Sequence, residues 1–183
     1  MENRGFLNRH LQSFIAGVII VGTVSLSRLL PHPPNVAPIT GLALFAGANL
    51  GGVTALALPL GSMLVSDLFL GFHATILYVY GSFALITWLG RYLARRWNFP
   101  RLMAISLFSS LLFFLVTNFG VWLQTNLYPK NWAGLGECYL MGLPFFRNTI
   151  LGDLAYTWFF FYGYSAVLAG FKMLGVKFTK LEA

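Results

Sequence analysis

Long apolar runs, separated at a few points by glycine, proline and charged residues, dominate the hydropathy pattern of this chain. A helix needs about 20 mostly apolar residues to cross the hydrocarbon core of a bilayer, and about 17 can suffice. Four runs reach this length clearly. They cover residues 13–30, 74–93, 102–123 and 148–168.

The stretch from residue 39 to residue 72 is too long for one membrane helix. It contains a single charge, Asp67, and is interrupted at Gly51-Gly52. Paired glycines favour a break, so we predict two short helices, over 39–50 and 53–72. The pattern thus predicts six helices and no strands.

Composition indicates that these helices lie in a membrane. Apolar residues make up 57% of the chain and charged residues only 9%, with a mean hydropathy of +0.72. The surface of a soluble domain usually needs about a quarter charged residues, so a water-soluble enzyme is excluded. We therefore predict an all-α integral membrane protein, one domain over residues 1–183 with six transmembrane helices, in the bacterial cytoplasmic (inner) membrane.

Basic residues near the helix ends orient the predicted bundle, because cytoplasmic loops carry the excess of Lys and Arg. With the N-terminus inside, three basic residues fall on the outer side: Arg28, Lys130 and Arg147. The rest fall on the inner side: Arg4, Arg9, Arg91, Arg95, Arg96, Arg101, Lys172, Lys177 and Lys180. Both termini are therefore predicted to be cytoplasmic, and the net charge of +7 reports topology rather than nucleic-acid binding.

The outer connections are unequal in length. Residues 31–38 and 71–75 form short ones, whereas residues 125–146 form a long one. This long segment contains glycines, a proline and too many polar groups to span a bilayer. We predict a lid loop over 125–146, with room for a short interfacial helix around 135–143.

Two acidic residues, Asp67 and Asp153, lie inside predicted helices. An uncompensated ionisable group in a bilayer costs several kcal/mol, so each acid is by default a functional hypothesis. Both lie in the outer third of their helices, and Asn118 lies at a similar height. Two interpretations stay open: the acids lock helices together through hydrogen bonds, or they form a polar ring at the bottom of an outward-facing pocket. The segments ending in Ser66-Asp67-Leu68 and Gly152-Asp153-Leu154 also echo one another, as an inverted repeat would.

Further pocket candidates are polar and aromatic residues at the outer helix ends. Tyr80 and Trp122 fit either an interfacial aromatic belt or stacking on a planar ligand. Arg147 fits either an interfacial anchor or a partner for a ligand carboxylate or phosphate. The predicted substrate-binding set is Asn35, Asp67, His73, Tyr80, Asn118, Trp122, Arg147, Asn148 and Asp153.

Small residues form a ladder that permits close helix approach. Ala43, Gly47 and Gly51 repeat at a spacing of four, and Gly52 follows. Spacing alone does not say whether the ladder packs on a helix of this chain or on another protein. We take these four residues as the candidate contact with a partner subunit.

Catalytic motifs are absent from the sequence. It has no HExxH, GxSxG, Walker or dinucleotide-binding pattern, so we predict neither an enzyme nor a bound cofactor. The single cysteine, Cys138, excludes an internal disulfide. Since the chain also lacks a charged relay through the inner half of the bundle, we expect that it does not drive transport alone.

Several segments together resemble the uncharacterised DUF6580 family, for which a transport role is expected. They are LPHPPNVAP at 30–38, ALFAGA at 43–48, SDLFLGFH at 66–73, VTNFGVW at 116–122, and PFFRNT with GD at 144–153. The resemblance covers roughly residues 13 to 170.

That family is in turn similar to the S components of energy-coupling-factor vitamin transporters. The resemblance implies a six-helix bundle with both termini cytoplasmic and a vitamin pocket near the outer face, with lids at 31–38 and 125–146. It implies a coupling surface on the first three helices, facing an energising transmembrane and ATPase module. Some solitary relatives handle cobalamin through a cysteine, which leaves Cys138 either a cobalt ligand or an inert thiol. The expected function is uptake of a small, vitamin-like nutrient; the alternative is a non-transporting accessory subunit of a larger membrane complex.

Overall fold

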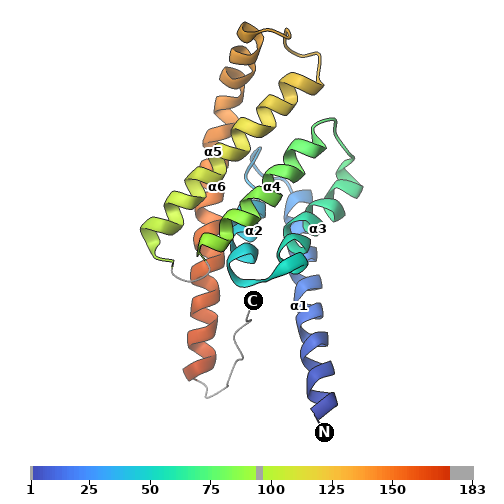
Figure 1. The fold of residues 1–183 in the computed structure, drawn as a ribbon, viewed down its shortest axis with the longest axis vertical. Coiled ribbons are helices and arrows are strands. Elements are labelled where there is room, and N and C mark those ends of the chain that lie inside the picture. The colour runs from blue at the N-terminus through green and yellow to red at the C-terminus, as the bar shows by residue number, and fades with distance from the viewer. Residues whose placement is uncertain (1, 94–96, 174–183) are drawn as a thin grey trace.

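The computed structural model describes the backbone of residues 2–93 and 97–173 and, of these, the side chains of residues 15–93, 97–170 and 172–173. This part of the chain is all-helical, as predicted, with six α-helices, one 3-10 turn and no strand. The elements are α1 (Glu2–Leu29), α2 (Ile39–Asn49), α3 (Gly52–Leu70), α4 (Ile76–Gly90), η1 (Arg91–Leu93), α5 (Phe99–Gln124) and α6 (Trp132–Met173). Figure 1 shows α1, α3 and α5 running upward and α2, α4 and α6 running downward.

Among the described helices, α3 and α5 are long and apolar enough to cross a membrane. Both have polar residues inside and apolar residues outside. On α3, Ser66 is buried while Leu68 is 65% exposed; on α5, Ser110 is buried while Phe108 is 54% exposed. This is the reverse of the pattern in water-soluble proteins, where large apolar side chains face the core.

The short helix α2 forms the centre of the bundle. It packs against α3, α4 and α6, and nearly all of it is buried, with Ala43 at 0% exposure. Gly47 crosses α4 so closely that a Cβ atom there would collide with the carbonyl oxygen of Thr87. The prediction that the ladder contacts another protein is therefore wrong for Ala43 and Gly47, because a helix of the same chain fills their contact surface. Gly51 and Gly52 are exposed, and their predicted role stays a prediction.

Local signals set two helix ends that differ from the prediction. The fifth helix begins at Phe99 rather than 102, because Oδ1 of Asn98 caps it by accepting a hydrogen bond from the backbone N–H of Arg101 at 3.0 Å. The third helix ends at Leu70 rather than 72, since Gly71 adopts φ 89° and donates its N–H to the Asp67 carbonyl at 2.8 Å.

The predicted loop over 125–146 is wrong from Trp132 onward, where the 42-residue helix α6 begins. Only residues 125–131 connect α5 to α6 outside a helix. Gly142 in this stretch serves helix packing instead of a turn: a Cβ on it would meet the Phe114 ring at 2.9 Å and Oδ1 of Asn118 at 2.6 Å. Close contact with α5 thus overrides the weak helix propensity of glycine and the missing N–H of Pro144.

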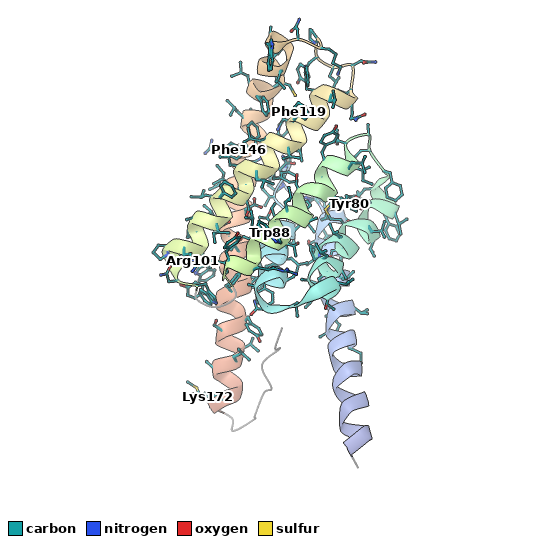
Figure 2. The ribbon with its side chains drawn as sticks, viewed as in Figure 1. Tyr80, Trp88, Arg101, Phe119, Phe146 and Lys172 are labelled. Carbon is teal, nitrogen blue, oxygen red and sulfur yellow. The ribbon has the colours of Figure 1, made fainter. Side chains whose placement is uncertain are left out.

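The basic residues used to orient the bundle are only partly described. Arg95, Arg96, Lys177 and Lys180 lie outside the described residues, as do the side chains of Arg4 and Arg9. Lys172 lies toward the lower end of the molecule, Arg101 near its middle height, and Phe119 toward its upper end (Figure 2).

Candidate functional site

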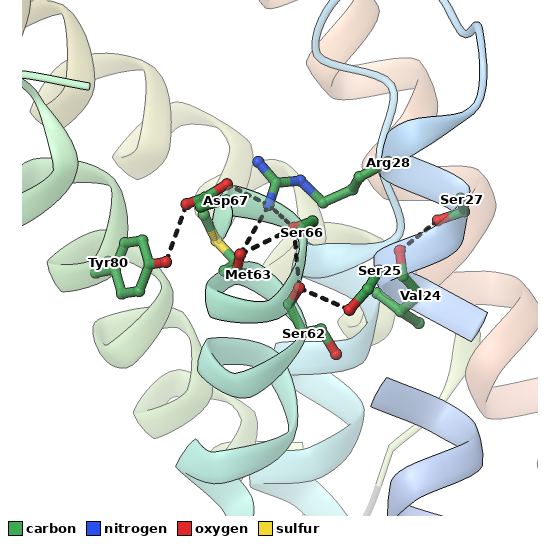
Figure 3. Close-up of polar contacts among 9 residues, drawn as sticks. All are labelled: Val24, Ser25, Ser27, Arg28, Ser62, Met63, Ser66, Asp67 and Tyr80. Atoms are coloured by element: carbon green, nitrogen blue, oxygen red, sulfur yellow. Dashed lines mark hydrogen bonds and ion pairs between the residues drawn. The ribbon is translucent and has the colours of Figure 1, made fainter. Parts of the chain in front are cut away.

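The first polar cluster joins α1, α3 and α4 around Asp67 (Figure 3). Asp67 is 2% exposed, and its Oδ1 accepts a hydrogen bond from Nη1 of Arg28 at 2.8 Å, which makes a buried ion pair. Its Oδ2 accepts a hydrogen bond from the Tyr80 hydroxyl at 2.9 Å. The carboxylate is therefore neutralised by a cation and bonded through both oxygens.

Packing of α1 on α3 brings Arg28 to Asp67, 39 residues away in sequence. One turn earlier, the Ser25 hydroxyl donates to the Ser62 carbonyl at 2.8 Å and fixes the two helices together. Nη1 of Arg28 also donates to Oγ of Ser66 and, at 3.4 Å, to the Met63 carbonyl. All these contacts use Nη1. Nε and Nη2, which carry three of the five guanidinium N–H groups, have no partner in the described part of the chain.

The second polar cluster surrounds Asp153 of α6. Asp153 is also 2% exposed, and its Oδ2 accepts a hydrogen bond from Oγ of Ser110 at 2.7 Å. The side chain of Thr40 on α2 lies beside the same carboxyl group and lines the same cavity. No Lys, Arg or His side chain pairs with Asp153 among the described residues. Hydroxyl groups alone thus solvate this buried carboxyl.

A cavity of about 140 Å³, here called the deep lobe, lies between the two clusters. Arg28 lines one wall and Asp153 lines another, with Thr40 of α2 beside it. Much of the remaining surface is apolar, so charges in the lobe are weakly screened. The other lining residues are His32, Asn35, Ala37, Ile39, Met63, Val79, Phe83, Phe113 and Thr149.

A second cavity of about 380 Å³, here called the outer lobe, adjoins the deep lobe between α5 and α6. Four residues line both lobes: Asn35, Val79, Phe113 and Thr149. Asn118 and Thr117 supply polar groups from α5, and the aromatic rings of Phe114, Tyr128 and Phe145 supply apolar surface. Together the lobes provide an apolar chamber with a charged inner end, the general form of a small-molecule site.

Three of the predicted site residues line this cavity: Asn35, Asn118 and Asp153. Asn35 adopts φ 63°, a left-handed conformation that asparagine tolerates better than most residues. Asp67 and Tyr80 lie behind Arg28 and line neither lobe. Their geometry matches the first interpretation, in which an acid locks helices together.

The other four predicted residues line neither lobe. Asn148 donates from Nδ2 to the Pro34 carbonyl at 3.1 Å and thereby ties the segment 30–38 to α6. Trp122 donates its indole N–H to the Pro129 carbonyl at 2.9 Å, and His73 contacts Oγ1 of Thr75 at 2.9 Å. Arg147 is exposed. A role for these residues in ligand binding stays a prediction.

Sequence reasoning missed the residues that complete both clusters. Arg28 was assigned only to the outer charge count, and Thr40 and Ser110 were not in the predicted set; nor was Thr149, which lines both lobes. A signal for Arg28 exists: it is a basic residue at the end of an apolar run, at the same predicted height as Asp67. Serine and threonine in membrane helices give no such signal, because they commonly bond their own helix backbone.

Metal binding gains no support from the described residues, which contain no group of three or more His, Cys, Asp or Glu placed to hold an ion. Cys138 lies in the upper part of α6, outside the predicted span, and its thiol donates to the Asn118 carbonyl at 3.3 Å. Burial raises the pKa of the Cys138 thiol, which disfavours the thiolate that a cobalt ion would need.

Comparisons with known proteins give one match. The model of a family of unknown function, DUF6580, matches residues 8–174, which confirms the resemblance seen in the sequence. No curated protein matches the chain, and no solved structure matches it.

Proposed function

The chain belongs to DUF6580, a family of unknown function, and from this premise we propose that it is a multi-pass protein of the cytoplasmic membrane. In this proposal it binds a small organic nutrient in its two-lobed cavity and contributes to the uptake of that nutrient. The observation that carries the proposal is the cavity itself. It combines an apolar chamber with a guanidinium and a carboxyl group that retain unused bonding capacity. A merely structural polar core would be expected to close around such groups.

Membrane insertion accounts for the distribution of apolar side chains. Leu68 and Phe69 of α3 and Phe108 of α5 are more than half exposed, and lipid would cover them. The helix α2, at 11 residues, is only about 16 Å long and too short to cross a hydrocarbon core of about 30 Å. It lies within the bundle, where nearly all of its own residues are buried against α3, α4 and α6.

The helix α6 requires a different arrangement. Its 42 residues measure about 63 Å, twice the hydrocarbon thickness. We assign the predicted span 148–168 to the bilayer, so that the part before Pro144 projects on the outer side beside residues 125–131. The cavity then opens toward the outer side, where Arg28, Lys130 and Arg147 are the outer basic residues.

Ligand retention tests the proposal directly. Purified protein in mild detergent should carry a small molecule that native mass spectrometry detects and that Thr117→Trp, which fills the outer lobe, displaces. Phe119→Trp is the matched control, because it adds an indole on the same helix at a position that does not line the cavity. Equal retention by both variants would contradict a site in this cavity.

Reporter fusions test the orientation. Fusions after Arg91 and after Lys172 should report cytoplasmic, and a fusion at Lys130 should report the outer side. A cytoplasmic Lys130 would overturn the outward-facing site.

Energy must come from elsewhere if uptake is concentrative, since the sequence has no nucleotide-binding motif. We propose either an energising transmembrane and ATPase module or facilitated movement of a ligand that is trapped inside. Purified protein in sealed liposomes should equilibrate the displaced ligand without accumulating it, with or without a proton gradient. Accumulation driven by a gradient alone would contradict this.

An accessory, non-transporting role is the second candidate. A lateral groove of about 500 Å³ between α3 and α4 favours it, because the small residues Gly52, Ala55, Gly81 and Ala84 line it and would admit a helix of a larger membrane complex. Filling the groove with Gly81→Leu would then dissociate a complex seen by native electrophoresis of gently solubilised membranes, while ligand retention would not change.

A further inference from the structure

The charges of the deep lobe do not balance. Arg28 and Asp67 form an ion pair and cancel one another, whereas Asp153 has no cationic partner among the described residues. The other titratable residues that line the two lobes are His32, Tyr128 and Cys138, and no Lys, Arg, Asp or Glu besides Arg28 and Asp153 lines either lobe. With Asp153 ionised, the chamber therefore carries one uncompensated negative charge.

This imbalance selects the charge of a ligand. A carboxylate that is held away from water by apolar surface is stabilised most by an opposite charge at short range. Ser110 donates a hydrogen bond to Asp153 and Thr40 lies beside it, but neither brings a charge. A protonated nitrogen from the ligand would supply the missing cation, whereas an anionic ligand would leave two negative charges in the chamber beyond the balanced pair.

Arg28 selects a second ligand group. Its Nε–H and one N–H of Nη2 form the side-on edge of the guanidinium, which presents two parallel donors. Since Nη1 takes all the contacts with α3, this edge keeps its donors unused while the side chain lines the lobe. A carbonyl oxygen or a ring nitrogen can accept from it, and neither adds negative charge.

Size and lining define the rest of the ligand. The deep lobe, at about 140 Å³, has room for a head group of roughly the volume of five water molecules. The outer lobe offers Phe114, Tyr128 and Phe145 as apolar surface for a planar body.

We propose, resting on the binding function proposed above, that this site takes a small organic monocation, a protonated amine or amidine attached to a planar body, with its charged nitrogen on Asp153 and a neutral hydrogen-bond acceptor on the side-on edge of Arg28. The ion pair with Asp67 holds Arg28 in position without leaving a net positive charge to repel such a ligand.

A matched series of probes tests the proposal through thermal stabilisation of the purified protein. The probes are phenylalaninamide and tryptophanamide, which are monocations with an acceptor; phenethylamine, a monocation without one; phenylalanine, a zwitterion; and 3-phenylpropionamide, which is neutral. At least one of the two cationic amides should stabilise the protein at millimolar concentration and bind about tenfold or more tightly than phenylalanine and 3-phenylpropionamide. Phenethylamine should bind more weakly than phenylalaninamide.

Two variants test whether Asp153 binds the cationic nitrogen of the probe and whether Arg28 binds its acceptor. Asp153→Asn should reduce binding of phenylalaninamide and tryptophanamide about 10- to 100-fold and abolish the preference for a cation. Arg28→Lys keeps a cation beside Asp67 but removes the side-on edge, so it should abolish the preference for phenylalaninamide over phenethylamine while the empty protein still elutes as a folded species. Lys172→Gln is the control, because Lys172 is an exposed cation that lines neither lobe; its binding should equal that of the original chain.

The outcomes of these measurements distinguish failure of the ligand class from failure of the binding function. Absence of stabilisation by both amides, or equal stabilisation by the zwitterion or by the neutral amide, would overturn the monocation assignment. If native mass spectrometry still shows a retained anion or neutral molecule that Thr117→Trp displaces, the binding function stands and only the ligand class is wrong. If no molecule is retained and no probe binds, both proposals fail.

Discussion

Asp67 and Asp153 are the two buried acids among the described side chains, and they lie in opposite electrostatic settings. Asp67 has a cation and a phenol on its two oxygens, whereas Asp153 has only the hydroxyl groups of Ser110 and Thr40. Each is 2% exposed, so burial does not distinguish them. The difference teaches that an acid within a membrane-type helix is a structural element when a cation of the same chain neutralises it, and a candidate ligand when it keeps its charge unpaired.

Removal of the cation from the Asp67 cluster should have the largest effect. Arg28→Gln leaves Asp67 buried without its partner, and breaking a buried ion pair in this way costs about 3–5 kcal/mol of folding free energy. Thermal unfolding in detergent and the yield of folded protein on size exclusion measure it. The double variant Arg28→Gln with Asp67→Asn should recover much of the loss, because no buried charge remains. If the single variant were as stable as the original chain, the ion pair would not lock α1 to α3.

The second-largest effect should come from the close crossing of α2 and α4 at Gly47. Gly47→Ala should destabilise the protein by about 1–3 kcal/mol, because the new methyl group meets the backbone of Thr87 and α2 must shift. Gly81→Ala is the matched control: a Cβ there meets nothing within 4 Å, and alanine favours the helix by about 0.5–1 kcal/mol. Equal melting temperatures for the two variants would mean that α2 and α4 do not cross this closely.

Neutralising the second acid should change stability least. Asp153→Asn keeps the shape of the side chain and can still accept from Ser110, so we expect a loss of less than about 1 kcal/mol. Ligand retention, measured by native mass spectrometry, should nevertheless fall sharply. A large loss of folded yield with unchanged retention per folded molecule would place Asp153 with Asp67 as a structural residue and remove the contrast between them.

Cys138, which lies on the same helix as Asp153 and lines the outer lobe, gives a pH-dependent probe of that lobe without a mutation. Because burial raises the pKa of its thiol, the reactive thiolate is scarcer at pH 7 than for an ordinary cysteine. Modification by methyl methanethiosulfonate should be slow at neutral pH and accelerate up to about tenfold per pH unit between pH 7 and 9. It is the one cysteine, so the rate is specific, and detergent-unfolded protein is the control. A fast, pH-independent rate would contradict a buried thiol.

Most of the helical fold could be predicted from the sequence. The run over 39–50 corresponds to α2 (Ile39–Asn49) and the run over 53–72 to α3 (Gly52–Leu70), with the break at Gly51-Gly52 between them. Apolar runs and paired glycines act locally, so the residues that end a helix stand beside it in the sequence. The start of α6 was missed for the opposite reason. Its glycines signal a loop locally, whereas the helix packs along α5, with Gly142 in close contact with Phe114 and Asn118.

The sequence also indicated that two acids would lie at similar heights in the bundle, but it assigned them equal weight. The two acids differ in the side chains that other helices place beside them. Arg28 of α1 lies beside Asp67, and Thr40 of α2 lies beside Asp153. Helical periodicity places a side chain on a face of its own helix and says nothing about the partner that faces it. Tertiary packing alone decided which acid has a cation at hydrogen-bonding distance, because Coulomb energy in a poorly screened interior depends on separations of a few ångströms.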